Sequence, residues 1–272
     1  MSSPGVSRAV AVLWAALAGA GLCAGAARAA GSIQEVADCA TRNLPPSAHA
    51  RVKLTLHPAK GEPRSVEVEY WSRTAPEGAR NVVISRPSAP DDEIAAYLVS
   101  DGDAIGEAWA FARAHGTPER IQTDGRDVRL FGSNVSVEDF ARFGRVLFPG
   151  QVRRLADGEV GGRKAYVVET HPSPEGGSEY SRIVTSIDKE WCMVMRRESY
   201  MADFAKGERP RKIYSVDPAD VRIDAGFANA HRARLDDAKD GSSTQMEILE
   251  LELPAKLDDA MFTPDALRRA AH

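Results

Sequence analysis

The sequence predicts a mainly β protein whose strands form one large antiparallel sheet. Three observations support this fold class. About a dozen segments show the apolar alternation of half-buried strands, turn-forming residues separate them, and only three segments have the spacing of helices. Because parallel strands need a long and usually helical crossover, strands that follow one another without helices favour antiparallel pairing.

The N-terminal segment has the features of a secretory signal peptide. It contains no acidic residue, Arg8 precedes an apolar stretch over residues 9–22, and a small-x-small pattern ends at Ala29. We therefore expect cleavage after Ala29. Residues 1–29 are then the cleaved signal peptide, and residues 30–272 are the mature, exported protein.

Two other interpretations of this segment were weighed. A membrane anchor is disfavoured because the apolar run is shorter than the about 20 residues that a spanning helix needs. Lipid attachment at Cys23 calls for a small residue before the cysteine, whereas the sequence has Leu22 there. Export with signal cleavage therefore explains the segment best.

The mature chain is expected to begin with a short helix. Ser32 and Glu35 have the Ser-x-x-Glu spacing of a capping box, and two prolines that follow Leu44 stop the helix. Apolar and polar residues then alternate over residues 52–56 and 66–70, with a Lys-Gly-Glu-Pro turn between them. These two stretches predict a half-buried antiparallel hairpin.

The rest of the chain continues this pattern. A helix that begins after Ser136 is predicted to reach Leu147, with Phe140 on its apolar stripe, and a last helix is predicted over residues 264–270. The chain shows no internal repeat and no low-complexity linker, so we expect residues 30–272 to form a single domain. Further strands are predicted at residues 81–85, 95–100, 107–113, 152–156, 164–169, 180–188, 192–200, 212–216, 230–235 and 245–253.

Export changes the interpretation of the cysteines. Signal cleavage removes Cys23 and leaves Cys39 and Cys192, an even pair in an oxidising compartment. A disulfide between these two residues is therefore the expected arrangement. A pair of free buried thiols and a catalytic thiol are the alternatives, the second of which would need a nearby histidine.

The search for chemistry in the sequence is mostly negative. A net charge of -4 and a pI of about 5.9 give no electrostatic reason to expect nucleic acid as a partner. The six histidines have no metal-ligand spacing, and adjacent acidic pairs such as Asp236–Asp237 are typical of solvated turns. The sequence also lacks the Gly-x-Ser-x-Gly motif of a nucleophile elbow, the Gly-x-x-x-x-Gly-Lys motif of a phosphate-binding loop and the His-Glu-x-x-His motif of a zinc-binding helix. We therefore expect that the protein is not an enzyme and that it binds neither a metal ion nor a cofactor.

The apolar and aromatic residues of the alternating strands are candidates for a ligand cavity. On a curled sheet they would face the interior, where ordinary core packing is the alternative to a cavity. Methionines would suit an apolar ligand because the thioether repacks easily. The candidate residues are Leu54, Leu56, Val66, Val68, Tyr70, Tyr97, Trp109, Phe111, Met193 and Met195.

Residues 132–140, 180–190 and 261–267 together resemble segments of the outer-membrane lipoprotein-sorting family, the LolA-like proteins of the bacterial periplasm. Residues 132–140 (GSNVSVEDF) are similar to the Gly-Ser-Asp-Phe-Ser-Tyr-Glu-Asp-Leu block of the family. Residues 180–190 resemble its strand that ends in Trp-x-Asp-Lys, and residues 261–267 resemble its closing segment. Their order along the chain matches the family as well.

The resemblance implies a strongly curved antiparallel sheet that forms a half-open barrel covered by helices. It also implies a monomeric periplasmic carrier that binds acyl chains of a lipoprotein or another lipid. An inner-membrane exporter and an outer-membrane acceptor would be its partners. Two other functions stay open at this point, namely a periplasmic hydrolase with an unrecognised site and an envelope interaction module that binds no ligand.

Overall fold

One antiparallel sheet of fourteen strands dominates the described part of the protein. The computed structural model describes residues 32–74, 80–101, 107–122, 128–143, 145–147, 150–173 and 178–272. The predicted signal peptide lies outside these residues. Among the residues described, no helix is long and apolar enough to cross a membrane.

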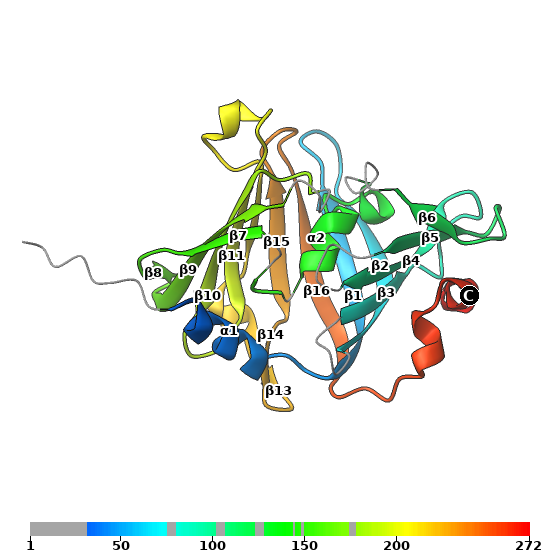
Figure 1. Cartoon of the computed structure of the whole chain (residues 1–272). Coiled ribbons are helices and arrows are strands. Elements are labelled where there is room, and N and C mark those ends of the chain that lie inside the picture. Colours follow the sequence, from blue (N-terminus) through cyan, green and yellow to red (C-terminus); the bar gives the residue numbers. More distant parts are fainter. Residues whose placement is uncertain are drawn as a thin grey trace, which may run out of the picture.

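The strand order shows two halves joined in the middle of the sheet. It runs β6-β5-β4-β3-β2-β1-β16-β15-β12-β11-β10-β9-β7, with β8 beside β9. β6 and β7 are the two ends of this path, so the sheet stays open, and Figure 1 shows it strongly curved. The predicted fold class is therefore confirmed. The strands are β1 (Ser47–His57), β2 (Arg64–Thr74), β3 (Arg80–Ser85), β4 (Ile94–Asp101), β5 (Ala108–Ala112), β6 (Glu119–Ile121), β7 (Gly150–Arg154), β8 (Gly158–Val160), β9 (Arg163–Pro172), β10 (Arg182–Asp188), β11 (Val194–Tyr200), β12 (Lys212–Ser215), β15 (Arg232–Asp237) and β16 (Ser242–Glu252).

Four short strands were not predicted from the sequence. β6 is one end of the sheet path, β8 pairs with β9 off the path, and β13 (Val221–Asp224) and β14 (Phe227–Ala230) form a separate hairpin. Each has only three or four residues, which is too short for an alternating pattern to stand out. The strand predicted over residues 230–235 is shifted, because β14 ends at Ala230 and β15 begins at Arg232.

The three helices lie where the sequence predicts helices, but the second is shorter than predicted, and the first three residues of the helix predicted over 264–270 form a 3-10 turn. They are α1 (Ile33–Arg42), α2 (Val137–Arg142) and α3 (Leu267–Ala270). Ser32 caps α1 by accepting a hydrogen bond from the backbone N–H of Glu35, as the capping-box spacing predicts. Short 3-10 turns are formed by Leu130–Gly132, Ala205–Gly207, Pro218–Asp220, Asp259–Phe262 and Pro264–Ala266.

The predicted extension of α2 to Leu147 is wrong. The helix ends at Arg142, and Phe143 has extended backbone geometry with ψ 128°. The Arg197 guanidinium, from β11, donates to the carbonyl oxygens of Arg142 and Arg145. A side chain from a distant strand thus satisfies carbonyl groups at the end of the helix, where continued helical bonds would otherwise do so.

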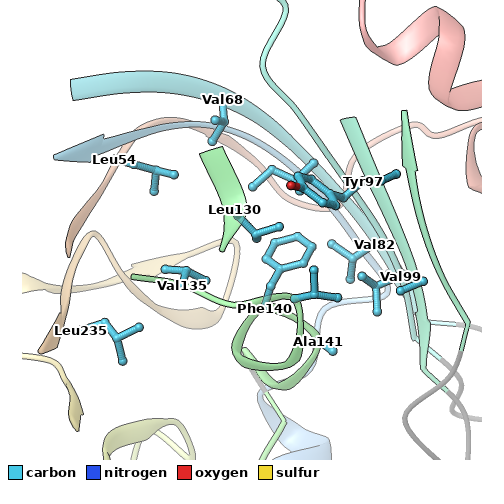
Figure 2. Packing of buried hydrophobic residues seen from close by; sticks show 14 residues of the cluster. Leu54, Val68, Val82, Tyr97, Val99, Leu130, Val135, Phe140, Ala141 and Leu235 are labelled. Atoms are coloured by element: carbon cyan, nitrogen blue, oxygen red, sulfur yellow. The ribbon is translucent and has the colours of Figure 1, made fainter. Parts of the chain in front are cut away.

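The two faces of the sheet carry separate apolar clusters. On β4, Tyr97 belongs to the cluster that packs around α2, whereas its neighbour Leu98 packs with Leu267 of α3. We call the face that carries α2 the inner face and the face that carries α3 the outer face (Figure 1). Figure 2 shows Phe140 of α2 among inner-face side chains such as Val82. The apolar core on the inner face is therefore formed by the sheet and α2 together.

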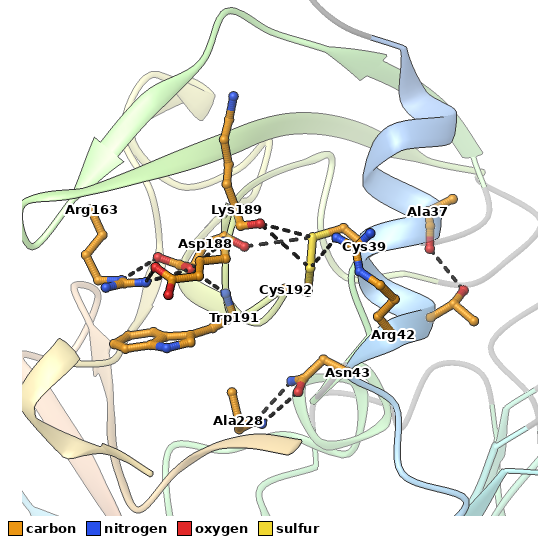
Figure 3. Close-up of a disulfide and its surroundings, with 12 residues drawn as sticks. Ala37, Cys39, Arg42, Asn43, Arg163, Asp188, Lys189, Trp191, Cys192 and Ala228 are labelled. Atoms are coloured by element: carbon orange, nitrogen blue, oxygen red, sulfur yellow. Dashed lines mark hydrogen bonds and ion pairs between the residues drawn. A yellow bond between two sulfur atoms is a disulfide. The ribbon is translucent and has the colours of Figure 1, made fainter. Parts of the chain in front are cut away.

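A disulfide joins α1 to the turn between β10 and β11. Cys39 and Cys192 are bonded, as the sequence predicts, and Cys192 has a positive φ of 56° (Figure 3). Asp188 organises this turn by accepting hydrogen bonds from the backbone N–H groups of Glu190 and Trp191 at 2.9 and 2.7 Å. The turn therefore presents Cys192 to the helix.

Removing the disulfide should lower the stability of the protein. The bond joins two residues that are 153 positions apart in the sequence. Opening a loop of this size should lower the free energy of unfolding by about 3 to 5 kcal/mol. A Cys39→Ser/Cys192→Ser double variant should therefore unfold at a lower urea concentration than the oxidised protein. Dithiothreitol should shift the midpoint of the wild type and leave that of the double variant unchanged. Equal midpoints for the oxidised wild type and the variant would contradict this expectation.

Candidate ligand cavity

The inner face contains a cavity of about 270 Å³ between the sheet, α2 and the C-terminal end of α1. Most of its lining is aliphatic or aromatic. The lining residues are Ala40, Asn43, Leu44, Pro45, Ala48, Ala50, Val52, Leu54, Val68, Tyr70, Ser72, Ile84, Leu130, Val135, Phe140, Phe143, Cys192, Met193, Val194, Arg197, Tyr214, Ala228, Asn229, Ala230, Ala233, Met246, Ile248, Leu251 and Leu253.

The wall formed by β1 follows directly from strand geometry. Alternate residues of a strand point to the same face, and Ala48, Ala50, Val52 and Leu54 all line the cavity. Two of these four residues are alanines, whose small side chains leave space next to the sheet. The alternation of β1 therefore provides both an apolar wall and room beside it.

On β16 a bulge keeps the apolar residues facing the cavity. Val52 of β1 pairs with Ile248, but Arg51 pairs with Glu250, so Leu249 is an extra residue in the ladder. Leu249 is 37% exposed, whereas Ile248 and Leu251 on either side of the bulge both line the cavity. Simple alternation along β16 would have turned Leu251 to the opposite face.

Aromatic side chains of α2 and its C-terminal flank cover the cavity. Phe140 meets Tyr70 of β2 edge to face, with ring centroids 6.0 Å apart. Phe143 meets Tyr214 of β12 with centroids 5.5 Å apart. Because β2 and β12 belong to different halves of the sheet, these two contacts place α2 across the junction of the halves.

The α1 end of the cavity is held by polar bonds and the disulfide. The Asn43 side chain donates to the carbonyl oxygen of Ala228 at 3.0 Å and accepts from its N–H at 2.7 Å (Figure 3). This pair of bonds joins the end of α1 to the hairpin of β13 and β14. Together with Cys192, Asn43 and Ala228 belong to the lining, so both attachments border the cavity.

Buried charges, in addition to apolar contacts, hold α2 on the inner face. Lys212 Nζ lies 2.6 Å from Asp139 Oδ2, and the Tyr180 hydroxyl donates to Asp139 Oδ1 at 2.6 Å. Burial disfavours the charged carboxylate, but Lys212 and the hydrogen bonds outweigh it and lower the pKa of Asp139. The pKa of Lys212 is raised in turn, since its carboxylate partners outweigh the effect of burial. Asp139 and Lys212 are thus a buried ion pair.

A second buried pair lies next to the first. Glu138 accepts from Arg142 within α2, and its other oxygen accepts from the backbone N–H of Glu179 at 2.7 Å. The carboxylate of Glu179 lies close to both acidic residues of α2. Burial, reinforced by the charges of Asp139 and Glu138, raises the pKa of Glu179 despite the opposing charge of Lys212.

Among the described residues that line the cavity, Arg197 is the only one with a charged side chain. It is only 6% exposed, and its two Nη atoms donate to the carbonyl oxygens of Arg142 and Arg145 at 2.9 and 2.5 Å. Burial and the charge of Arg142 lower the pKa of Arg197 to about 10. The guanidinium therefore still carries its positive charge at neutral pH.

Some of the residues predicted to line a cavity border this one. Leu54, Val68, Tyr70 and Met193 belong to the lining. Tyr97 is buried in the inner-face cluster, where burial raises its pKa to about 12. Leu54, Val68, Tyr70 and Tyr97 lie where strand alternation on the inner face predicts, whereas Met193 precedes β11.

Other predicted residues lie elsewhere. Trp109 and Phe111 pack on the outer face with the C-terminal segment, because on β5 the small residues Ala108 and Ala110 face inward. Met195 is the extra residue of a bulge, since Ser186 pairs with Arg196 and Ile187 pairs with Val194. The remaining predicted residues outside the lining are Leu56, which is half-buried on β1, and Val66, which packs against the inner-face cluster.

Arg197 and the contact between Asn43 and Ala228 at the α1 end of the cavity were not found from the sequence. A lone arginine in an alternating strand usually faces solvent, and nothing in the sequence distinguishes Arg197 from Arg196. The bulge at Met195 determines which of the two points inward. Asn43 and Ala228 come from chain segments far apart, and the sequence carries no signal that they meet.

The described residues show no arrangement typical of a metal centre. No group of three or more His, Cys, Asp and Glu side chains in this part of the chain could hold a metal ion. The buried carboxylates Glu138 and Asp139 make ion pairs with Arg142 and Lys212. The described lining of the cavity is mainly apolar and carries one positive charge, that of Arg197.

Comparison with known proteins gives a family and a fold. A family model described as an uncharacterized protein matches residues 80–269. A sequence comparison with curated proteins finds no match.

Three solved structures are similar to the chain. They are a domain assigned to outer membrane lipoprotein sorting from Vibrio parahaemolyticus (TM-score 0.75, 18% identity, covering 87% of this chain and 97% of that one), a DUF1329 family protein from Desulfovibrio piger (0.74, 18%, 86% and 96%) and a LolA superfamily protein from Nitrosomonas europaea (0.62, 17%, 85% and 97%). At these identities the likeness establishes the fold.

Breaking the buried ion pair behind α2 should destabilise the protein. A Lys212→Met substitution leaves Asp139 buried without its cation, for which we expect a loss of about 3 to 5 kcal/mol at pH 7 in urea unfolding. A Lys212→Met/Asp139→Asn variant is the control and should recover part of the loss. Equal stabilities for all three proteins would contradict the assigned pair.

The pH dependence of the same variants follows from the lowered pKa of Asp139. A carboxyl group whose pKa is lower in the folded state stabilises the fold above its unfolded pKa of about 3.9, and this contribution is lost as the pH falls through the folded pKa. The deficit of Lys212→Met should therefore shrink on acidification, because protonation removes the uncompensated charge from the variant. Urea midpoints between pH 7 and pH 3 measure this change.

Proposed function

We propose that this chain, which belongs to the family of uncharacterized proteins matched over residues 80–269 and has a LolA-like fold, is a carrier that holds an acyl chain of a lipid or lipoprotein in the cavity of its inner face. The observation that supports this function most directly is the cavity of about 270 Å³ with its mainly apolar lining. A module that only bound other envelope proteins through its surface would have no need of such a space. The sorting role named for the Vibrio parahaemolyticus domain agrees with the proposal.

The carrier works by hiding apolar surface rather than by chemistry. Each methylene group exposed to water costs about 0.8 kcal/mol, so an acyl chain does not leave a membrane readily. A lined cavity removes most of this cost while the chain crosses an aqueous compartment. We expect Leu54, Val68, Tyr70 and Met193 to contact the chain, with the thioether of Met193 adapting to its path.

The proposal places the mature protein in the periplasm. Residues 1–29 would be removed as a signal peptide, and residues 30–272 would act as a single monomeric domain. An oxidising compartment agrees with the disulfide between Cys39 and Cys192. Loading at an inner-membrane exporter and delivery to an outer-membrane acceptor would complete the cycle.

Extraction of the purified protein tests the carrier function. The mature chain, secreted from its own signal peptide and purified without detergent, should release lipid into organic solvent, as detected by mass spectrometry. The delipidated protein should bind Nile red, a neutral dye whose emission rises in apolar surroundings, and added amphiphile should displace the dye. Protein that yields no lipid and binds no dye would overturn the proposal.

Filling the cavity should weaken ligand binding more than it lowers the stability of the fold. Ala50 lies on the cavity wall and is 4% exposed, so an Ala50→Phe side chain would occupy space that the ligand needs. We expect Nile red affinity to fall roughly tenfold or more, which corresponds to the loss of about 1.4 kcal/mol or more of apolar contact. Thr55→Phe, on the opposite face of the same strand, is the matched control and should bind as the wild type does. Equal binding by Ala50→Phe would place the dye elsewhere.

A further inference from the structure

The hairpin of β13 and β14 has one aliphatic side and one mostly polar side. It forms a two-stranded sheet of its own, and residues opposite each other in an antiparallel ladder project to the same side. One side carries Val221, Ile223, Ala228 and Ala230. The other side carries Arg222, Asp224, Phe227 and Asn229. The hairpin therefore presents a short aliphatic surface.

This aliphatic side continues the wall of the cavity. Ala228 and Ala230 belong to the cavity lining. Ile223 lies outside the lining but is the ladder partner of Ala228, and the Cβ atoms of such partners are about 4.5 to 5.5 Å apart. The apolar surface therefore extends from the cavity wall to Ile223.

The end of this surface is open to solvent. Ile223 is 60% exposed, more than any other large hydrophobic residue in the described part of the chain, whereas its partner Ala228 is 6% exposed. A single exposed isoleucine on a protein surface needs no explanation. This one adjoins a cavity with a mainly apolar lining, which makes it a candidate contact for whatever the cavity holds.

Hydrogen bonds and an ion pair hold the hairpin in place. Asp224 Oδ2, at the end of β13, lies 2.9 Å from Nε2 of His231, which directly precedes β15. On β14, Ala228 makes its two bonds with the side chain of Asn43. The backbone that carries Ile223 is thus fixed at the α1 end of the cavity, where Figure 1 shows the hairpin projecting beside α1.

The size of the cavity makes such a surface useful to a ligand. Its volume of about 270 Å³ is slightly below the range of roughly 300 to 1,000 Å³ that is usual for ligand pockets. A long acyl chain therefore needs apolar surface beyond the enclosed space, because each methylene group left in water costs free energy. The aliphatic side of the hairpin is such a surface, directly next to the lining.

We propose that the binding site continues beyond the cavity along β13 and β14, and that Ile223 contacts the part of a long acyl chain that the cavity does not enclose. The inference rests on the proposed carrier function and adds a preference for long chains to it. A long chain gains the contact with Ile223, whereas a short chain ends inside the cavity.

A series of fatty acids that share one head group tests the extension in the wild type. Octanoic, dodecanoic and hexadecanoic acid are titrated at pH 8, below their micellar concentrations, against the delipidated mature protein loaded with Nile red. Affinity should rise at both steps of the series, because the added methylene groups are still removed from water. An affinity that stops rising at dodecanoic acid overturns the inference alone. Displacement of the dye by none of the three acids overturns the carrier proposal itself.

A substitution at the tip of the hairpin assigns the gain to Ile223. Ile223→Ser should lower the affinity for hexadecanoic acid roughly fivefold and leave that for octanoic acid unchanged. Ile223→Leu should bind all three acids as the wild type does. Leu249→Ser is the matched control, because Leu249 is also an exposed aliphatic residue but belongs to neither the lining nor the hairpin.

The serine variant should keep the urea midpoint of the wild type, because the side chain that it replaces is mostly exposed. In a folded Ile223→Ser protein, an equal loss of affinity for every acid, or no loss for any, would overturn the assignment. Weaker binding to phosphatidylglycerol vesicles with an unchanged response to chain length would show that the tip contacts a membrane instead. That result also overturns the proposal.

Discussion

The pairing of β1 with β16 is the interaction on which the rest of the structure depends. It joins residues near position 50 to residues near position 250, and so connects two meanders that would otherwise be separate antiparallel sheets. The bulge at Leu249 is part of this junction, because it turns Leu251 toward the same side as Ile248. Both the continuity of the sheet and the apolar wall at its centre therefore follow from one non-local ladder.

The inner face is covered by α2 in a way that leaves space. A short helix that relied only on apolar contacts would sink onto the sheet until the gap closed, since protein interiors pack densely. Here the ion pair of Asp139 with Lys212 and the bonds from Arg197 anchor the helix from the β11–β12 side. Polar anchors set the height of α2 above the sheet, and the cavity is the space below it. Buried pairs of this kind add little net stability, which agrees with a role in positioning.

Part of the site could be predicted from the sequence, and part could not. Leu54, Val68 and Tyr70 could be predicted to face inward because their strands alternate without interruption. The same reasoning placed Met195 beside Met193, but the bulge between β10 and β11 breaks the alternation there. For Trp109 and Phe111 the alternation was correct and the choice of face was not, because large residues on β5 pack under the C-terminal segment while alanines face inward.

The sequence by itself determined the antiparallel fold class, the approximate positions of most strands and the starts of the first two helices, and it indicated the cysteine pair. These features depend on local pattern, capping and composition, which a single chain displays directly. Only the tertiary structure decided where α2 ends, which face of β5 points inward, and that Arg197 rather than Arg196 borders the cavity. Each of these depends on a ladder register or a contact between distant segments, and a one-residue bulge is enough to exchange the two faces of a strand.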